Sequence, residues 1–150
     1  MKDKKVIWIT GASSGIGNAL ALKFAQEGWI VAASARREIL LQELTKINQN
    51  IHSFPLDVTN PEQCKKVFED IRKKFNNIEI SIFGTGIHDP NSEKRFNLEK
   101  IREIMEVNYF GTMNSINAVY DYYNDKKSGQ ISIISSVAGY RGLPAAGAYC

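Results

Sequence analysis

A glycine-rich turn follows the first apolar run of the sequence and has the composition of a phosphate-binding loop. It reads Thr10-Gly11-Ala12-Ser13-Ser14-Gly15-Ile16-Gly17. Glycines let a backbone approach a pyrophosphate closely, and the start of the following helix offers free N–H groups and a partial positive charge. The alternative is a purely structural turn. We expect a dinucleotide to be bound by Gly11, Ser13, Ser14, Gly15, Ile16 and Gly17.

The spacing of these glycines, Gly-x-x-x-Gly-x-Gly, is distinctive. It differs from the Gly-x-Gly-x-x-Gly dinucleotide fingerprint and from the Gly-x-x-x-x-Gly-Lys loop of nucleotide triphosphatases. The turn lies between an expected strand and an expected helix, which is the setting that dinucleotide binding requires.

Two arginines stand where many dinucleotide folds carry an acidic residue. That residue lies about 20 positions after the glycine turn and bonds the ribose 2′-hydroxyl. Here the corresponding stretch is Ser34-Ala35-Arg36-Arg37, which contains no carboxylate. Guanidinium groups instead match the oxygens of a 2′-phosphate. Arg36 and Arg37 therefore predict NADP(H) rather than NAD(H), the alternative being that they only begin an exposed helix.

Strand and helix patterns alternate along the chain. Short apolar runs without polar alternation predict buried strands. Helical spacing of apolar residues predicts helices between them, the third beginning near Thr59-Asn60-Pro61 and the last running from about Leu98 to Asp125, in one or two pieces. The expected strands are Val6–Ile9, Ile30–Ala33, Ile51–Leu56, Ile78–Phe83 and Ile131–Ile134.

This alternation predicts an α/β fold of the Rossmann type, a doubly wound parallel sheet in one domain over residues 1–150. We expect the strand order 3-2-1-4-5. Ligands in such sheets bind beyond the carboxyl ends of the strands, where the strand order reverses. The residues expected along that edge are Gly11–Gly17, Arg36–Arg37, Asp57, Gly84–Gly86 and Ser135–Ser136.

With these residues in place, the chain resembles the short-chain dehydrogenase/reductase family over essentially its whole length. The gap of 13 residues between Ser136 and Tyr149 matches the family's serine–tyrosine spacing. The matching pieces, in order, are Thr10-Gly11-x-x-x-Gly15-Ile16-Gly17, Asp57-Val58, Asn108 within Val107-Asn108-Tyr109-Phe110-Gly111, Ser135-Ser136 and Tyr149.

The resemblance implies hydride transfer between a nicotinamide ring and a carbonyl or alcohol carbon of a small molecule. It implies that Tyr149 donates a proton to the carbonyl oxygen and that Ser136 holds that oxygen. It also implies that Asn108 orders a water leading to a lysine, although Asn108 could instead satisfy backbone groups at a helix kink. Asp57 and Val58 would contact the adenine, and Gly86 would line the nicotinamide ribose.

The two histidines, His52 and His88, are not expected to be catalytic. His52 falls within an expected strand, and His88 lies in a polar loop, where a substrate contact stays open. The alternative for Tyr149 is an ordinary interface tyrosine, which would be the favoured interpretation without its 13-residue spacing from Ser136. Ser135 is expected to be structural.

The chain departs from the family pattern at two places. After the fourth strand the family has Asn-Asn-Ala-Gly, where this chain has Phe83-Gly84-Thr85-Gly86. We expect Thr85 to replace part of the missing asparagine's hydrogen bonding. The family also has a lysine four residues after the tyrosine, which helps a phenol that otherwise titrates near pH 10. This sequence ends at Cys150.

The missing lysine leads us to expect the N-terminal part of a reductase of about 250 residues. The fifth strand would then lie at an exposed sheet edge. The 150-residue chain alone is expected to have negligible reductase activity. The alternative is a non-catalytic NADP(H)-binding module or a relic of an enzyme.

Composition excludes several other functions. The chain has 19 basic and 16 acidic residues, and its basic residues are scattered rather than gathered in the stripe that nucleic-acid binding needs. No apolar run approaches the roughly 20 residues of a membrane span. Two cysteines without metal-ligand spacing suggest neither a disulfide framework nor a metal site, so we expect a cytoplasmic protein. The longer reductase is expected to form homo-oligomers.

Overall fold

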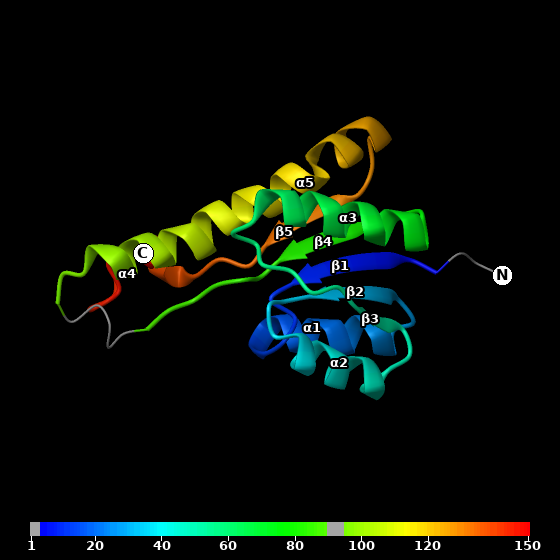
Figure 1. Cartoon of the computed structure of the whole chain (residues 1–150), viewed down its shortest axis with the longest axis horizontal. Helices are drawn as coiled ribbons and strands as arrows, with labels where there is room; N and C mark the ends of the chain where they lie inside the picture. Colours follow the sequence, from blue (N-terminus) through cyan, green and yellow to red (C-terminus); the bar gives the residue numbers. More distant parts are fainter. Residues whose placement is uncertain (1–3, 90–94) are drawn as a thin grey trace.

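The computed structural model of the chain describes residues 4–89 and 95–150 as an α/β fold with five strands (Figure 1). In chain order its elements are β1 (Val6–Thr10), α1 (Gly15–Gln26), β2 (Ile30–Ser34), α2 (Glu38–Ile47), β3 (Ile51–Ser53), α3 (Pro61–Phe75), β4 (Ile80–Phe83), α4 (Leu98–Met105), the π-helix η1 (Glu106–Phe110), α5 (Gly111–Lys126), β5 (Gln130–Ile133) and the short 3₁₀ turn η2 (Val137–Gly139).

The sheet is parallel throughout, in the order β3-β2-β1-β4-β5. The predicted fold and strand order are therefore confirmed. The third strand is shorter than predicted, ending at Ser53, although the main-chain N–H of Leu56 still bonds the Ala35 carbonyl at 3.1 Å. Strand β5 forms one edge of the sheet, as expected.

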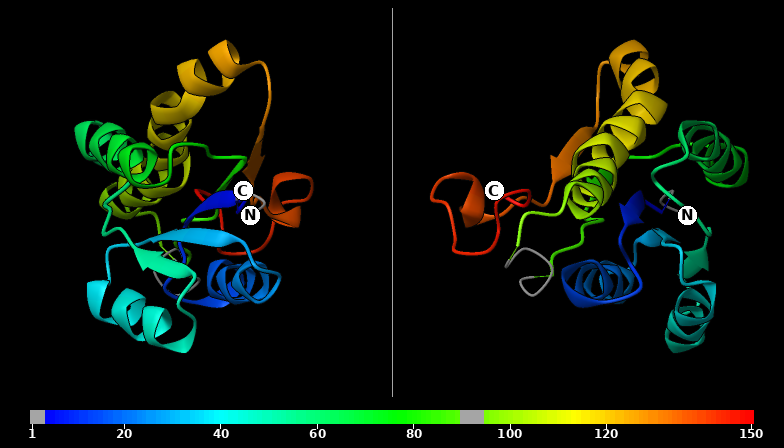
Figure 2. Two further views of the ribbon diagram at one scale, coloured as in Figure 1. Left: turned by 90° about the vertical axis from the view of Figure 1, so that its right-hand side faces the viewer. Right: turned by 60° about the vertical axis from the view of Figure 1, so that its left-hand side comes forward.

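Helices cover both faces of the sheet, which explains why its strands are continuously apolar. On one face, Val6 and Trp8 of β1 join a core cluster that includes Phe68 of α3 and Val119 of α5. On the other face, alternate β1 residues join a cluster with Ala21 of α1 and residues of α2. Figures 1 and 2 show this three-layer arrangement from different sides.

Small residues bring α1 against the sheet. Its buried positions are Gly17, Ala21 and Ala25, which recur every four residues on one face of the helix. The glycine-rich turn lies directly before this closely packed helix, since α1 begins at Gly15.

The chain is helical without a break from Leu98 to Lys126. Within this region, residues Glu106–Phe110 form a π-helical segment between α4 and α5. A π-segment shifts the register of the side chains that follow, and such segments are frequent at functional sites. Where α5 begins, a side chain at Gly111 would collide with Val58, since an added Cβ would lie 2.5 Å from Val58 Cγ2. Glycine there lets the helix pack tightly on the chain segment after β3.

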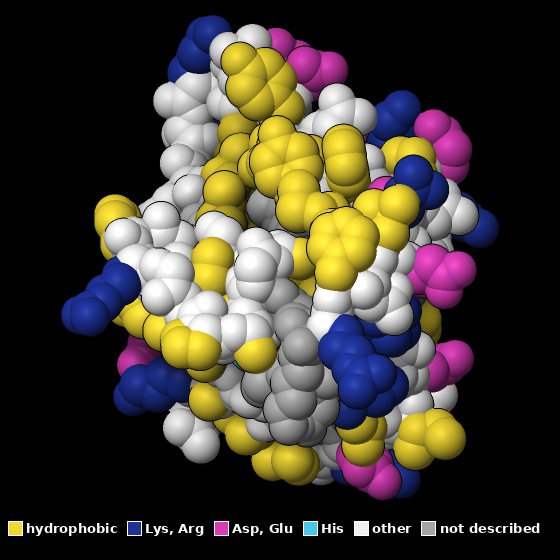
Figure 3. Space-filling model, turned by 90° about the vertical axis from the view of Figure 1, so that its left-hand side faces the viewer, with side chains coloured by type: hydrophobic (Ala, Val, Ile, Leu, Met, Phe, Trp, Pro, Cys, Tyr) yellow, Lys and Arg dark blue, Asp and Glu magenta, His cyan; other side chains and the backbone are white. Residues whose placement is uncertain are grey.

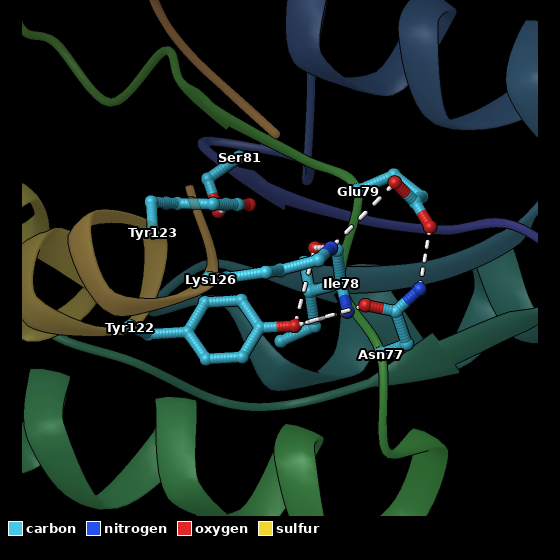
Figure 4. Close-up of polar contacts among 7 residues, drawn as sticks. All are labelled: Asn77, Ile78, Glu79, Ser81, Tyr122, Tyr123 and Lys126. Atoms are coloured by element: carbon cyan, nitrogen blue, oxygen red, sulfur yellow. Dashed lines mark hydrogen bonds and ion pairs between the residues drawn. The ribbon is translucent and has the colours of Figure 1, made fainter. Parts of the chain in front are cut away.

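The last turns of α5 hold the segment that enters β4 (Figure 4). The Tyr122 hydroxyl accepts a hydrogen bond from the main-chain N–H of Ile78 at 2.9 Å. Lys126 donates to the Ile78 carbonyl at 3.0 Å and pairs with Glu79 at 3.6 Å. This network lies at the amino end of β4, opposite the edge at which the ligand is expected.

Candidate active site

One cavity of about 870 Å³ lies at the carboxyl edge of the sheet. Its volume is within the range of small-molecule and cofactor sites. The segments that follow β1, β2, β4 and β5 all contribute to its wall, as the topology predicted for a switch-point site. Of the predicted site residues, those lining it are Gly11, Ser13, Ser14, Gly15, Ile16, Gly17, Arg36, Arg37, Gly86, Asn108, Ser136 and Tyr149.

The glycine turn is shaped by two close backbone approaches. Gly11 has φ +73°, and a Cβ there would lie 2.5 Å from the carbonyl oxygen of Gly84. A Cβ at Gly17 would collide with the carbonyl of Gly11. Gly15 also has a positive φ, +56°, yet it faces open space. Packing therefore requires glycine at positions 11 and 17, and backbone conformation favours it at position 15. The open space beside Gly15 leaves room for a ligand.

The two arginines flank one end of the cavity. The guanidinium of Arg37 donates hydrogen bonds to the hydroxyls of Ser13, at 2.9 and 3.2 Å, and Ser14, at 2.6 Å. Arg36 is exposed beside it. Neither arginine forms an ion pair with a carboxylate within residues 4–89 and 95–150. This end of the cavity is a concentration of positive charge suited to an anionic group.

Ser136 and Tyr149 border the same cavity. Ser136 caps η2, and its hydroxyl accepts a hydrogen bond from the Ala138 N–H at 3.2 Å. Tyr149 is half-buried in a segment of turns, and its ring stacks on His88 with ring centres 4.4 Å apart. Exposed Val137, Tyr140 and Leu143 lie along this segment, and Figure 3 shows apolar side chains gathered on this end of the molecule.

Asn108 lies in the π-segment and reaches across to the loop after β4. Its side-chain amide accepts from the Ile87 N–H at 2.8 Å and donates to the Ile87 carbonyl at 2.9 Å. A Cβ at Gly86 would lie 3.6 Å from Asn108 Oδ1. Asn108 therefore satisfies backbone groups of that loop. The sequence left open that Asn108 satisfies backbone groups at a helix kink, whereas the groups it bonds belong to the loop.

Comparison with known proteins identifies the family. The model of the short chain dehydrogenase family matches residues 5–150. The chain belongs to this family. Mouse "dehydrogenase/reductase SDR family member 7" is 29% identical over 156 residues, covering 97% of this chain and 45% of the relative. The 3-oxoacyl-[acyl-carrier-protein] reductase FabG of Thermotoga maritima is 33% identical over 146 residues, covering 95% and 59%.

A solved structure, "ElxO with NADP Bound", superposes with a TM-score of 0.86 and 27% identity, covering 97% of this chain and 61% of that one. The chain thus spans about half to three-fifths of the length of the relatives that it matches. Membership of the short-chain dehydrogenase/reductase family makes the protein part of an oxidoreductase family that uses a nicotinamide cofactor.

Two residues of the family pattern lie outside the cavity wall. Val58 is buried and packs on α5, and Asp57 uses its carboxylate to accept hydrogen bonds from the N–H and hydroxyl of Thr59, at 3.0 and 2.9 Å. Leu56 reaches the cavity instead. Contact between the adenine and Asp57 or Val58 stays a prediction.

The departure after β4 has a different outcome from the one expected. The hydroxyl of Thr85 is buried and has no hydrogen-bond partner in the described part of the chain, so the expectation that it replaces asparagine bonding was wrong. The β4 end is tied elsewhere, since the Thr10 hydroxyl accepts from the Gly84 N–H at 3.3 Å. A buried polar atom without a partner in a cavity-lining residue fits a site that is completed by a ligand.

Sequence reasoning missed several cavity residues. They include Leu56, Ile87, Thr112 and Met113. His88, for which a substrate contact stayed open, also lines the cavity. Leu56 directly precedes Asp57 at the end of the third strand, so its place could have been inferred. The helical residues Thr112 and Met113 could not, because the π-segment sets their direction.

The remaining candidates are not in the site. His52 packs against Phe75 at the far edge of the sheet, where burial and then the neighbouring Lys74 lower its pKa. No group of three or more potential metal ligands occurs in the described ranges. Among the same residues, no helix has the length and apolar character needed to cross a membrane.

Proposed function

We propose that this chain binds NADP(H) and is the cofactor-binding part of an oxidoreductase that interconverts a small-molecule carbonyl and its alcohol. The observation that carries the proposal is the composition of one cavity. Its glycine turn and arginines suit the phosphates of a dinucleotide, and Ser136 and Tyr149 suit a reacting carbonyl oxygen.

Preference for NADP(H) rests on charge. A 2′-phosphate beside Arg36 and Arg37 would accept charge-assisted hydrogen bonds. The hydroxyls of Ser13 and Ser14 already orient Arg37 toward the phosphate turn. An NAD-type site would present a carboxylate to the ribose hydroxyls at this point, and Ser34-Ala35-Arg36-Arg37 contains none. The NADP-bound relative agrees with this preference.

The chemistry assigned to the chain's own residues is proton handling. The nicotinamide ring, when bound, would supply a hydride to the carbonyl carbon. Tyr149 would donate its phenolic proton to the carbonyl oxygen, which balances the reduction to an alcohol. Ser136 would hold that oxygen by a hydrogen bond. Asn108 would keep the loop after β4 in place beside them.

The test is binding followed by turnover. NADPH and NADH are titrated into the 150-residue chain by fluorescence, and NADPH oxidation is then followed with a panel of aldehydes and ketones. We expect NADPH to bind more tightly than NADH. We expect oxidation by these 150 residues to be negligible, because the polypeptide assayed does not include the position four residues after Tyr149 where the family has its lysine. Failure to bind either cofactor would contradict the proposal. Rapid NADPH oxidation would contradict only the part that concerns the lysine.

The second candidate, a non-catalytic NADP(H)-binding module, gives the same binding result. The two candidates are distinguished by assaying the protein purified from its natural source with the same panel of aldehydes and ketones. Only an enzyme would oxidise NADPH in that assay.

A further inference from the structure

A histidine that the proposed chemistry does not use lies face to face with Tyr149. The rings of His88 and Tyr149 are 4.4 Å apart with an angle of 29° between their planes. Both residues line the cavity, and they come from segments separated by about 60 residues of chain. Stacked ring pairs have a preferred geometry, so each ring limits the directions that the other can take.

Among residues 4–89 and 95–150, no hydrogen bond to the Tyr149 phenol sets its ring direction. Tyr149 lies in a segment of turns outside the helices and strands, and its main-chain N–H bonds the Ala146 carbonyl at 3.1 Å. A proton donor must be held within hydrogen-bond reach of its target, because small displacements of a catalytic group lower the rate steeply. A side-chain contact is therefore the feature best able to orient this phenol.

His88, by contrast, follows a firmly held residue. Its neighbour Ile87 has both main-chain polar groups bonded by the side chain of Asn108, at 2.8 and 2.9 Å. Asn108 is itself part of the continuous helix through η1. A line of contacts thus runs from the helix, through Ile87, to the ring of His88 and onto Tyr149.

We propose that His88 is a positioning residue: its imidazole is the platform that orients the Tyr149 ring, and Asn108 holds that platform in place through Ile87. This inference rests on the role of Tyr149 given under the proposed function. It gives His88 a role that depends on its ring shape. Phenylalanine should therefore replace it and leucine should not.

The experiment observes Tyr149 directly by NMR of the chain labelled with ¹³C in its six tyrosine rings. Tyr149→Phe and Tyr140→Phe assign the two signals needed, Tyr140 being 97% exposed and serving as the unstacked reference. The variants are His88→Ala, His88→Leu and His88→Phe. His52→Ala is the matched control, because it removes the chain's other histidine. Each spectrum is recorded with and without saturating NADP⁺, and each variant's thermal unfolding is measured.

We expect the Tyr149 ring protons to lie upfield of those of Tyr140 in the unaltered chain. That shift should be lost in His88→Ala and His88→Leu and kept in His88→Phe and His52→Ala. The leucine variant keeps most of the bulk of the side chain. If the alanine variant does not fold, His88→Leu therefore still tests whether the Tyr149 shift depends on a ring at position 88. A Tyr149 signal that is unchanged in the variants lacking a ring at position 88 would overturn the inference.

The NADP⁺ arm separates this inference from the proposed function. Saturating NADP⁺ should move the Tyr149 signal in the unaltered chain and in His88→Phe. If NADP⁺ binds and Tyr149 does not respond, the proposed role of Tyr149 fails even where the stacking is present. If Tyr149 responds equally in His88→Leu, the ring platform is unnecessary and the inference fails alone.

Discussion

The guanidinium of Arg37 donates a 2.9 Å hydrogen bond to the hydroxyl of Ser13, joining the end of β2 to the turn after β1. A second bond to the hydroxyl of Ser14, at 2.6 Å, continues the contact. Guanidinium donors here meet neutral oxygens, although they bond charged oxygens more strongly. A phosphate at this position would therefore gain more from Arg37 than the serines provide.

The first prediction concerns cofactor selectivity. Arg36→Ala with Arg37→Ala should weaken NADPH binding by roughly tenfold or more, since each hydrogen bond to a charged group contributes about 1.5–3 kcal/mol. NADH has no 2′-phosphate, so its affinity should change little. Titration with both cofactors measures the ratio, and Lys46→Ala, on the exposed end of α2, is the control for net charge. Equal weakening of both cofactors would refute the 2′-phosphate assignment.

The second prediction separates two physical reasons for glycine in the turn between β1 and α1. Gly11 and Gly15 both have positive φ, but only Gly11 faces backbone atoms. Gly15→Ala should cost about 1–2 kcal/mol, the ordinary penalty of a left-handed residue. Gly11→Ala carries that penalty together with a collision against Gly84, so it should lower the free energy of unfolding distinctly more. Urea denaturation of the two variants compares them, and equal losses would show that the Gly84 contact relaxes freely.

The main features of the fold were accessible from the sequence because each depends on local pattern. Continuous apolar strands such as Val6–Ile9 indicated a sheet covered on both faces, and helical connections indicated parallel strands. The site edge followed from topology, since residues directly after parallel strands must meet at one edge.

The parts that could not be predicted depend on contacts between distant segments. Spacing indicated Tyr149 but not its stacking on His88, because the loop and the turn segment meet only in three dimensions. Composition indicated a loop after β4 but not that Asn108 would hold it. The face of α1 that packs on the sheet consists of the small residues Gly17, Ala21 and Ala25 rather than its most apolar ones, and apolar periodicity alone does not indicate that choice.

The third prediction concerns the buried hydroxyl of Thr85. It has no partner within residues 4–89 and 95–150, whereas in the unfolded chain it bonds water. Thr85→Val keeps the shape and removes that cost, so it should raise the free energy of unfolding without ligand by about 1 kcal/mol. Thr112→Val is the matched control, since its hydroxyl bonds the Asn108 carbonyl at 2.7 Å and its loss should destabilise. Destabilisation by Thr85→Val would mean that its hydroxyl has a partner in solution.

The fourth prediction concerns alkaline pH. Burial raises the pKa of the Cys64 thiol to about 11; a hydrogen bond with Ser115 opposes the rise, and the charge of Asp57 adds to it. The unfolded chain therefore loses this proton at lower pH than the folded chain. The contribution of Cys64 to the free energy of unfolding should be fully present below about pH 8.5. It should decline as the pH rises toward 11, by at most about 1.4 kcal/mol per pH unit.

Urea denaturation between pH 7 and 10 measures that slope, and Cys64→Ala should flatten it. Tyr123, whose pKa burial also raises, adds a similar decline only above about pH 10. An identical slope in Cys64→Ala would assign the alkaline loss to other groups.

The last prediction concerns the network that anchors β4 from α5. Tyr122→Phe removes the hydroxyl that accepts from the Ile78 N–H at 2.9 Å and donates to Asn77 at 3.1 Å. Leaving a main-chain donor without its partner should cost about 1–3 kcal/mol of unfolding free energy. Tyr120→Phe makes the same chemical change two residues earlier on a side chain that is 59% exposed, so it should cost almost nothing. Equal denaturation curves for the two variants would show that water replaces the Tyr122 hydroxyl at no cost. Because this network lies at the opposite end of β4 from the cavity, NADPH affinity should be the same in both variants.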